Sequence, residues 1–292
     1  MSVKIIQKRL ETYQCASAQE EDHALREITQ EVALAALSRT DFYRVASFHG
    51  GTCLRVFYGL NRFSEDLDFI LRESTPGFSW KKYLKSLSVE FEAYGYRAEI
   101  VNRSQPDSTV KKAFIKDGSL EKVLRLRHLK ANRSLPKIRI KFEVDTNPPA
   151  GSVFENQFLD FPFACAVTVQ NMPSLFAGKV HSLLCREYVK GRDWYDFLWY
   201  TSRRATINFK FLAAALNQAG PWANQNIAVD SRWCYAELRR KISVMDWNAA
   251  RADVARFIKT NELASLDLWN AAFFLERTKR LKRVPSTLRG EG

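Results

Sequence analysis

Two aspartates, Asp66 and Asp68, stand one residue apart in the run RFSEDLDF at residues 62–69. On an extended segment the side chains of residues i and i+2 project from one face, so both carboxylates point the same way while Leu67 and Phe69 face a core. Carboxylates this close repel each other unless a cation lies between them. Their oxygens suit Mg²⁺, which also binds phosphate oxygens. The pair therefore indicates metal-assisted chemistry on a phosphate ester, with a solvated polar strand face as the simpler alternative.

A glycine pair, Gly50 and Gly51, precedes the aspartates in the run HGGTCLR at residues 49–55. At a turn from strand to helix, glycines expose backbone N–H groups and remove the Cβ atoms that would block a phosphate. The positive end of a helix expected to begin at Thr52 adds to this attraction. A glycine pair alone is usually a plain turn, but here the aspartates follow after about one helix. Together the two features predict a nucleotide site.

A third carboxylate is needed to hold two metal ions at a phosphoryl-transfer site. Residues 136–146 alternate as a strand does, with apolar side chains on one face and Arg139, Lys141, Glu143 and Asp145 on the other. Glu143 is our candidate and Asp145 its rival. From spacing alone, a charged strand edge is an equally good interpretation.

A second group of charged residues follows at Lys179, Arg186, Lys190, Arg192, Asp193 and Asp196. On a helix from Ser174, Lys179 and Arg186 share a face. Such cations ordinarily form a solvated surface, but in a triphosphate site they would neutralise the phosphates. We expect Asp193 to open the next helix and to cap its N–H groups, orient a cation or act as a base.

The elements that must position these residues change character along the chain. The predicted helices are 17–38, 52–59 and 79–94, and the predicted strands are 43–48, 64–71, 96–102, 110–115, 136–146 and 164–169. After residue 172 only helices are expected, at 174–187, 193–201, 209–219, 232–242, 247–259 and 266–281. We predict an α+β domain over residues 1–172, with a sheet flanked by helices, and a helical domain with a basic tail over 173–292.

Composition excludes several classes of protein. A hydrophobic content of 46% excludes a largely disordered chain. The five cysteines form no CxxC pair, and the longest apolar runs have six residues, so we expect no disulfide framework, no zinc knuckle and no membrane span. We expect a cytoplasmic protein.

The net charge of +13 is concentrated in two stretches, residues 111–141 and 276–292. Localised positive charge predicts a polyanionic partner such as RNA, with an ordinary solvated surface as the alternative. The candidate RNA-binding residues are Lys111, Lys112, Arg125, Arg127, Lys130 and Arg133.

The runs GGTCLR, RFSEDLDF and RIKFEV, followed by K(x)₆R(x)₅RDWYDF, resemble the AbiEii/AbiGii toxin family of the DNA polymerase β-type nucleotidyltransferases, over roughly residues 20–200. The resemblance implies a mixed nucleotidyltransferase-type sheet followed by a helical domain, and a toxin that works beside a neighbouring DNA-binding antitoxin. It implies that Gly50 and Gly51 form the phosphate-binding turn, that Asp66, Asp68 and Glu143 are the metal carboxylates, and that Lys179 and Asp193 form the last motif. The second glycine replaces the superfamily's usual serine, which leaves the role of Thr52 open.

The resulting hypothesis is transfer of a nucleoside monophosphate from an NTP to the 3′ end of tRNA or to another RNA, with Mg²⁺ or Mn²⁺, which would block translation. Further candidate nucleotide contacts are Thr52, Arg55, Ser64 and Lys179. The alternatives are nucleotidylation of a protein or small molecule, and a non-catalytic protein of this fold that binds RNA or the antitoxin.

Overall fold

The computed structural model describes residues 2–105, 108–119, 124–126, 128 and 138–283. The chain forms two compact units. Unit 1 consists of Met1–Pro148 and Phe154–Val169, and unit 2 of Pro149–Val153 and Gln170–Gly292. The division of the chain at residue 172 into two independent domains stays a prediction.

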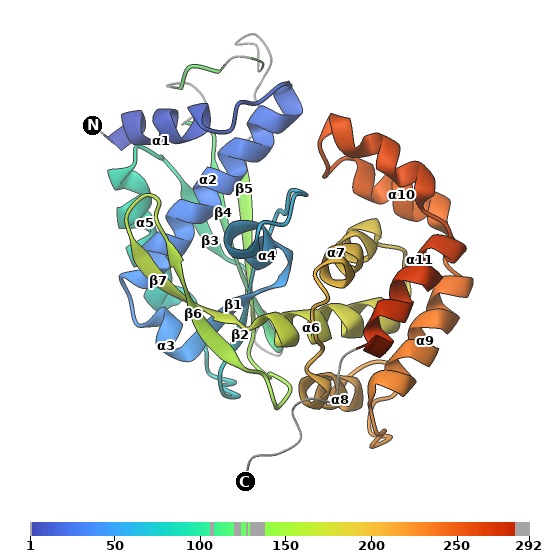
Figure 1. The fold of residues 1–292 in the computed structure, drawn as a ribbon. Helices are drawn as coiled ribbons and strands as arrows, with labels where there is room; N and C mark the ends of the chain where they lie inside the picture. Colours follow the sequence, from blue (N-terminus) through green and yellow to red (C-terminus); the bar gives the residue numbers. More distant parts are fainter. Residues whose placement is uncertain (1, 106–107, 120–123, 127, 129–137, 284–292) are drawn as a thin grey trace. The chain divides into compact units, whose positions relative to one another are not determined.

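Unit 1 is built on a mixed sheet of seven strands in the order β3-β4-β5-β2-β1-β7-β6 (Figure 1). Strand β2 pairs in parallel with β5 and antiparallel with β1, while β4 pairs antiparallel with both β3 and β5. This arrangement confirms the predicted α+β class. The strands are β1 (Ala46–His49), β2 (Leu67–Leu71), β3 (Glu99–Asn102), β4 (Val110–Asp117), β5 (Ile138–Asp145), β6 (Phe154–Leu159) and β7 (Cys165–Gln170).

Helix α2 packs on the sheet of unit 1, and α1 packs on α2. Helix α2 packs against β5 and α5 and crosses in front of the strands in Figure 1. Its start is set by Ser17, whose hydroxyl accepts a hydrogen bond from the Glu20 N–H, and by acidic residues in the first turn. The helices are α1 (Ser2–Glu11), α2 (Ala18–Ser38), α3 (Phe42–Val45), α4 (Gly50–Tyr58) and α5 (Lys81–Ala93).

Three elements of unit 1, α1, α3 and β6, were not predicted. Helix α1 is short and mostly polar, and only Ile6 and Leu10 bury a narrow stripe. Strand β6 is at the sheet edge, where most side chains face solvent and alternation carries little signal. The predicted strand 43–48 was wrong in its first half, because Phe42–Val45 form a helical turn before β1.

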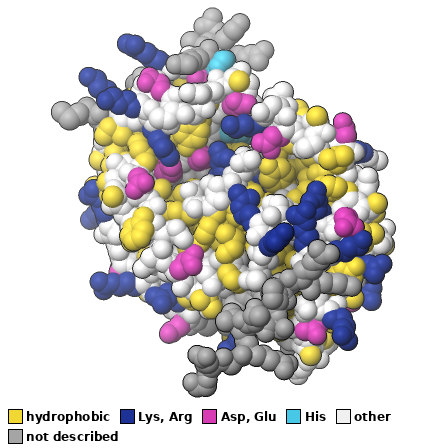
Figure 2. All heavy atoms as spheres, in the orientation of Figure 1, with side chains coloured by type: hydrophobic (Ala, Val, Ile, Leu, Met, Phe, Trp, Pro, Cys, Tyr) yellow, Lys and Arg dark blue, Asp and Glu magenta, His cyan; other side chains and the backbone are white. Residues whose placement is uncertain are grey.

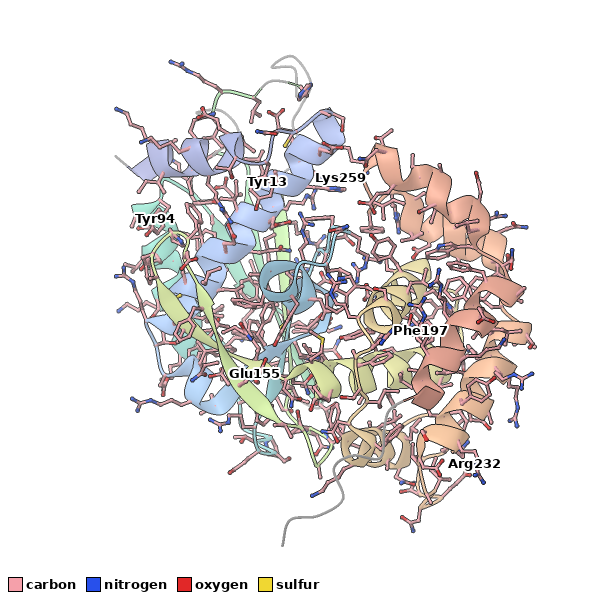
Figure 3. The ribbon with its side chains drawn as sticks, in the orientation of Figure 1. Tyr13, Tyr94, Glu155, Phe197, Arg232 and Lys259 are labelled. Atoms are coloured by element: carbon pink, nitrogen blue, oxygen red, sulfur yellow. The ribbon has the colours of Figure 1, made fainter. Side chains whose placement is uncertain are left out.

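Unit 2 is helical in its described part, apart from its short link to the sheet. Its helices are α6 (Met172–Cys185), α7 (Gly191–Ser202), α8 (Phe209–Gln218), α9 (Ser231–Ser243), α10 (Trp247–Ala255) and α11 (Ala271–Thr278), with 3₁₀ segments at Thr260–Leu268 and Lys279–Arg283. Helix α7 carries much of the core: the Trp194 ring centroid lies 5.1 Å from that of Trp247 and 5.4 Å from that of Phe274. Phe197 of the same helix, labelled in Figure 3, has its ring centroid 6.2 Å from that of Phe176. Among the described residues, no helix is both long enough and apolar enough to cross a bilayer.

Candidate active site

The glycine turn lies directly against the aspartate strand in unit 1. His49, the last residue of β1, is the strand partner of Asp68, so α4 begins beside the Asp68 side chain. Gly50 has a φ of +78°, and a Cβ atom there would lie 2.7 Å from Asp68 Oδ2. A Cβ at Gly51 would lie 2.5 Å from Arg62 Nη2. Only glycine fits both positions without displacing a neighbour. The helix begins at Gly50 rather than at Thr52, because the glycines themselves supply its first turn.

Strand pairing brings the third carboxylate to the aspartates. Asp68 of β2 and Glu143 of β5 are direct partners in the parallel pair. The Lys141 ammonium joins the same group, since its Nζ atom lies 3.1 Å from Asp66 Oδ2 and 3.0 Å from Glu143 Oε2. Lys112 of β4, which lies opposite Glu143, approaches Glu143 Oε1 at 3.2 Å. One face of the sheet therefore collects Asp68, Glu143 and two lysines from three neighbouring strands, and Asp66, just before β2, joins them through Lys141.

The two carboxylates that share Lys141 differ in acidity. Burial raises the pKa of Asp66 above its ordinary value, and the attraction of Lys141 offsets this only in part. Burial acts in the same direction on Glu143, but hydrogen bonds and charge from Lys141 and Lys112 outweigh it, so the pKa of Glu143 is lowered. The pKa of Lys141 is raised, because its two carboxylates outweigh the effect of its own burial. The cluster is thus held together by a cation.

Carboxylate oxygens are the ligands that Mg²⁺ and Mn²⁺ prefer. Among the described residues, no group of three or more His, Cys, Asp or Glu side chains is arranged to hold a metal ion. Mg²⁺, however, commonly takes only one or two protein carboxylates and completes its coordination with phosphate oxygens and water. Asp66 and Asp68 offer carboxylates for that mode, and the Lys141 ammonium already lies against Asp66 at 3.1 Å.

Two predicted nucleotide contacts support the site from within the fold. Thr52 is fully buried, and its hydroxyl donates a hydrogen bond to the main-chain oxygen of Asp66. Arg55 Nε donates to Glu27 Oε2 at 2.8 Å, and its Nη1 donates to the main-chain oxygens of Leu60 and Asn61. Both side chains therefore support the geometry of the glycine turn and the aspartate loop, and their contact with a nucleotide stays a prediction.

Ser64 and the rival carboxylate, Asp145, differ in their distance from the turn. The Ser64 hydroxyl would lie 3.0 Å from a Cβ at Gly51, which places it at the turn. Gln30 anchors this loop, because its side-chain amide donates to the main-chain oxygens of Ser64 and Glu65 at 2.9 Å each. Asp145 lies opposite Ile70 rather than Asp68 and accepts a hydrogen bond from the Asn147 N–H at 2.9 Å. Strand register therefore favours Glu143.

The second charged cluster is a buried ion-pair network within unit 2. Lys179 Nζ of α6 lies 2.6 Å from Asp193 Oδ1 and 2.8 Å from Asp196 Oδ2, both on α7. Arg186 Nε lies 3.1 Å from the other Asp193 oxygen. Burial would raise the pKa of Asp193, but the surrounding cations, Lys179 first, lower it to about 2. Asp193 lies in the first turn of α7 rather than at its cap, which is Lys190.

Gly191 controls how closely the acidic helix of this network packs. A Cβ atom at Gly191 would lie 1.8 Å from the main-chain oxygen of Ala250 in α10. Helix α7 can therefore approach α10 only with glycine at this position, and the same contact lets the Arg192 N–H donate to Asp253 Oδ2 at 3.3 Å. Helix α7, which carries the two aspartates, is therefore packed against α6 on one side and α10 on another.

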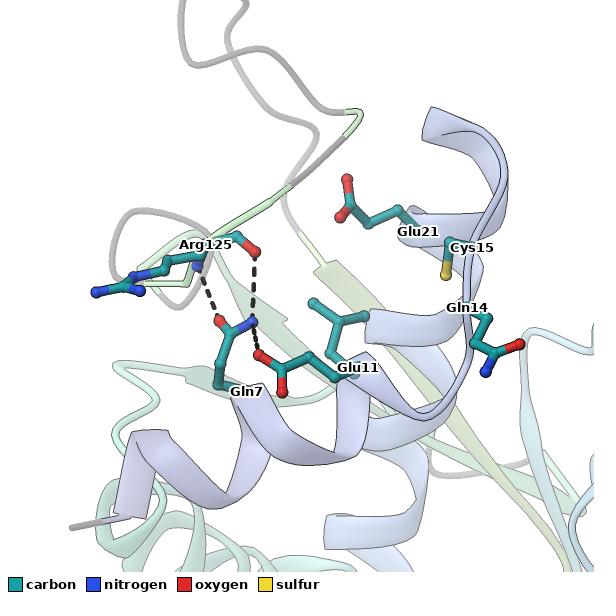
Figure 4. Close-up of a pocket in the computed structure, with 7 residues that line it drawn as sticks. Gln7, Glu11, Gln14, Cys15, Glu21 and Arg125 are labelled. Carbon is teal, nitrogen blue, oxygen red and sulfur yellow. Dashed lines mark hydrogen bonds between the residues drawn. The ribbon is translucent and has the colours of Figure 1, made fainter.

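The predicted RNA-binding residues divide into three groups. Lys111 is wrong as a surface contact, because it is buried, 6% exposed, and its Nζ donates to the main-chain oxygen of Gln105 at 2.9 Å. On β4, residue 111 alternates to the apolar face, and Lys112 takes the open one. The Arg125 side chain is exposed, while its backbone is held by Gln7 (Figure 4). Arg127, Lys130 and Arg133 lie outside the described residues.

Sequence reasoning missed Lys141 as a member of the site. The alternation of residues 138–145 already placed Lys141 on the face of Glu143, but it did not reveal that Asp66 would approach the same ammonium. Net charge does not distinguish Lys141 from the other basic residues, and Figure 2 shows Lys and Arg side chains together with acidic and apolar ones on the face that it draws.

Two solved structures from Helicobacter pylori share this fold. One, a candidate nucleotidyltransferase, is 16% identical, with a TM-score of 0.50 over 88% of this chain and 92% of that chain. The other, JHP933, is 14% identical, with a TM-score of 0.52 over 89% of this chain and 91% of that chain. No curated protein matches the sequence.

A protein family described as "Nucleotidyl transferase AbiEii toxin, Type IV TA system" matches residues 32–277, a segment that includes the glycine turn, the three carboxylates and the Lys179 network. With most of its length matched, the chain belongs to the AbiEii family of nucleotidyltransferase toxins of type IV toxin–antitoxin systems.

Proposed function

We propose that this protein transfers a nucleoside monophosphate from an NTP to the 3′ end of an RNA, with tRNA as the acceptor, and so blocks translation. The observation that carries the proposal is the placement of the glycine turn at Gly50 against Asp68, with Glu143 beside Asp68 on the next strand. A turn that presents backbone N–H groups next to paired carboxylates suits a metal-bound triphosphate.

The proposed step is an in-line displacement at the α-phosphorus. The 3′ hydroxyl oxygen of the RNA forms a bond to phosphorus, the bond from phosphorus to the bridging oxygen of the β-phosphate breaks, and pyrophosphate leaves. The hydroxyl proton passes to solvent. Gly50 and Gly51 hold phosphate oxygens through their backbone N–H groups, and Ser64 lies at the turn, where its hydroxyl can donate to the same phosphates.

Asp66 and Asp68 would hold Mg²⁺ or Mn²⁺, and Glu143 would provide the third carboxylate. When bound, the metal lowers the pKa of the attacking hydroxyl and neutralises charge on the phosphates. For Glu143 to take part, Lys141 must give up its contact at 3.0 Å. Lys141 would then be free to pair with the triphosphate, whose own negative charge would attract the ammonium once a metal neutralised the carboxylates.

In unit 2, Lys179 and Asp193 would serve the same reaction. The network holds Lys179 between two carboxylates, 2.6 and 2.8 Å away, which fixes the direction of its ammonium. We assign Lys179 as the basic residue of the last motif and Asp193 to the orientation of Lys179. Family membership supports a partner antitoxin, which we propose to be a DNA-binding protein encoded next to the toxin. We place the reaction in the cytoplasm, and the five free thiols suit a reducing compartment.

The proposal is tested by incubating the protein with each α-³²P-labelled NTP, tRNA and Mg²⁺ or Mn²⁺. We expect labelled RNA, and loss of labelling in Asp66→Asn and Asp68→Asn. Asp160→Asn is the matched control, since Asp160 is an exposed aspartate of the same unit. Label on a protein or small molecule instead of RNA would show that this molecule, and not RNA, is the acceptor. Full labelling of RNA by the Asp68→Asn variant would refute the proposed active site. If the protein bound no NTP in the presence of metal, the non-catalytic alternative would be supported instead.

A further inference from the structure

Strands β3, β4 and β5 turn one face towards the three carboxylates and away from the apolar core. Strand register places Lys112 opposite Glu143, Phe114 opposite Lys141, and Lys116 opposite Arg139. Val101 of β3 lies opposite Phe114, which extends the face by one strand. The alternate residues, among them Ile115, Ile140 and Phe142, are buried on the other face. The polar face is thus a continuous part of the sheet that begins at the proposed active site.

An aromatic ring with two arginines lies at the centre of this face. The Arg139 guanidinium lies 4.7 Å from the centroid of Phe114, and the Arg103 guanidinium lies 5.9 Å from it. Phe114 is only 9% exposed, while both arginines are exposed, so the guanidinium groups form the outer layer over the ring. Within the part of the chain that the structure describes, neither arginine forms an ion pair with a carboxylate.

The lysines on this face are bound to carboxylates to different degrees. Lys112 is engaged by Glu143 at 3.2 Å. Lys116 is the strand partner of Glu99, so its charge has an acidic neighbour. Arg103 and Arg139 add to this face two exposed cations that, unlike the lysines, have planar head groups. Two planar cations that lie over an aromatic ring can bind phosphates through their edges and bases through their planes.

We propose that this arginine platform, Arg103 and Arg139 over Phe114, binds the single-stranded end of the RNA acceptor and leads it along the sheet to Glu143 and the aspartates. The inference rests on the proposed transfer to RNA and names the surface that recognises it. Single strands suit the platform because unpaired bases stack on planar side chains, while their phosphates pair with exposed cations. From Phe114, Lys141 on the adjacent strand connects the platform to Asp66 and Glu143.

The test measures binding of fluorescently labelled tRNA by anisotropy, without NTP or metal, over a range of salt concentrations. We expect the Arg103→Gln/Arg139→Gln variant to bind roughly tenfold more weakly near 0.1 M salt and to lower the slope of log K against log salt by about 1.4, or about 0.7 for each lost phosphate contact on a single strand. Both side chains are exposed, so the melting temperature should not change.

The matched control is Arg44→Gln/Arg72→Gln, which removes the same charge from unit 1. Both control arginines are exposed, and Arg72 lies 5.5 Å from the centroid of Phe154, so this pair also includes an arginine over an aromatic ring. Arg44 precedes β1 and Arg72 follows β2. Both therefore lie at the end of this strand pair that is farther from His49 and Asp68. This control should bind tRNA as the wild type does. Equal weakening by the two double variants would reduce the effect to net charge and overturn the platform.

A second variant separates stacking from charge. Arg103→Lys/Arg139→Lys keeps both charges and should keep the salt slope, yet bind more weakly, because the ammonium group has no plane on which a base can stack. Wild-type affinity in this variant, or in the glutamine variant, would overturn the inference. The binding assay contains no nucleotide, so its result does not depend on the transfer assay. Label found on protein in the transfer assay would refute RNA as the acceptor, whereas the binding assay would still show whether the platform binds RNA.

Discussion

Asp68 and Glu143 are neighbours across a parallel strand pair, although an antiparallel hairpin and a helix separate them along the chain. Their pairing places Glu143 next to the strand that borders the glycine turn, whereas Asp145 is the partner of Ile70. Spacing alone left the choice between Glu143 and Asp145 open, and strand register favours Glu143 as the third carboxylate. The relationship also explains why a lysine of the same strand, Lys141, can contact both Asp66 and Glu143.

Register leads to a direct comparison of Glu143→Gln with Asp145→Asn. If Glu143 is the third carboxylate, its amide variant should lose at least about 10- to 100-fold in NMP transfer, the range that weakened metal coordination commonly costs. Asp145→Asn should retain most activity, because its oxygen is engaged by the Asn147 N–H. Initial rates of RNA labelling measure both. A larger loss in Asp145→Asn would exchange the two assignments.

The glycine turn offers a test that separates backbone strain from steric clash. Gly50→Ala should lower the free energy of unfolding by about 1–2 kcal/mol because alanine is strained at φ +78°. Gly59→Ala is the control, since Gly59 has φ +73° and open space where its Cβ would be. Both variants should be destabilised, but only Gly50→Ala should lose NMP transfer, because its methyl group displaces Asp68. Chemical denaturation and transfer assays decide. Equal activity of the two variants would contradict the close approach.

Lys141→Met should make the carboxylate cluster depend on an added cation. Without the ammonium, Asp66 and Glu143 repel each other, and we expect a loss of about 1 kcal/mol in unfolding free energy in the absence of metal. Added Mg²⁺ or Mn²⁺ should reverse this loss of stability. Mn²⁺ should bind the variant several-fold more tightly than it binds the wild type. Lys116→Met is the control on the neighbouring strand, opposite Arg139. A metal response identical to that of the wild type would show that Lys141 does not share the cation position.

The buried network of unit 2 predicts an acid-sensitive contribution to stability. The pKa of Asp193 in the folded protein is about 2, below its ordinary value of 3.8. Because folding lowers this pKa, ionised Asp193 contributes stability above about pH 4, and the contribution is lost as the pH falls towards 2. The full contribution is on the order of 2 kcal/mol, at 1.36 kcal/mol for each pKa unit.

The Asp193→Asn variant isolates the stability that ionised Asp193 contributes. The wild type should be more stable than the variant at pH 6, and the difference should shrink steadily between pH 4 and pH 2. Urea unfolding at several pH values measures it. Asp267→Asn, at an exposed aspartate of the same unit, should show no such pH dependence. A difference that stays constant down to pH 2 would mean that the network does not depend on the ionised carboxylate.

Much of the fold was predictable from local patterns. The helix predicted at 17–38 forms at Ala18–Ser38, and the strand predicted at 136–146 forms at Ile138–Asp145, because long periodic segments with clear caps or alternation carry strong signals. The short polar elements α1 and β6 lack such signals. The composition of residues 111–141 indicated a basic surface, yet Lys111 is buried and Lys112 is paired, since alternation along β4 sends neighbouring lysines to opposite faces.

The sequence by itself determined which residues are available for chemistry: a glycine pair, two aspartates at i and i+2, and a charged strand with two candidate carboxylates. These are local properties, because turn conformation and side-chain alternation depend on neighbouring residues. Only the tertiary structure decided that Gly50 lies against Asp68, that Glu143 is the register partner of Asp68, and that Thr52 supports Asp66. Strand order and register decide these contacts, and both result from packing distant segments around one core rather than from any local pattern.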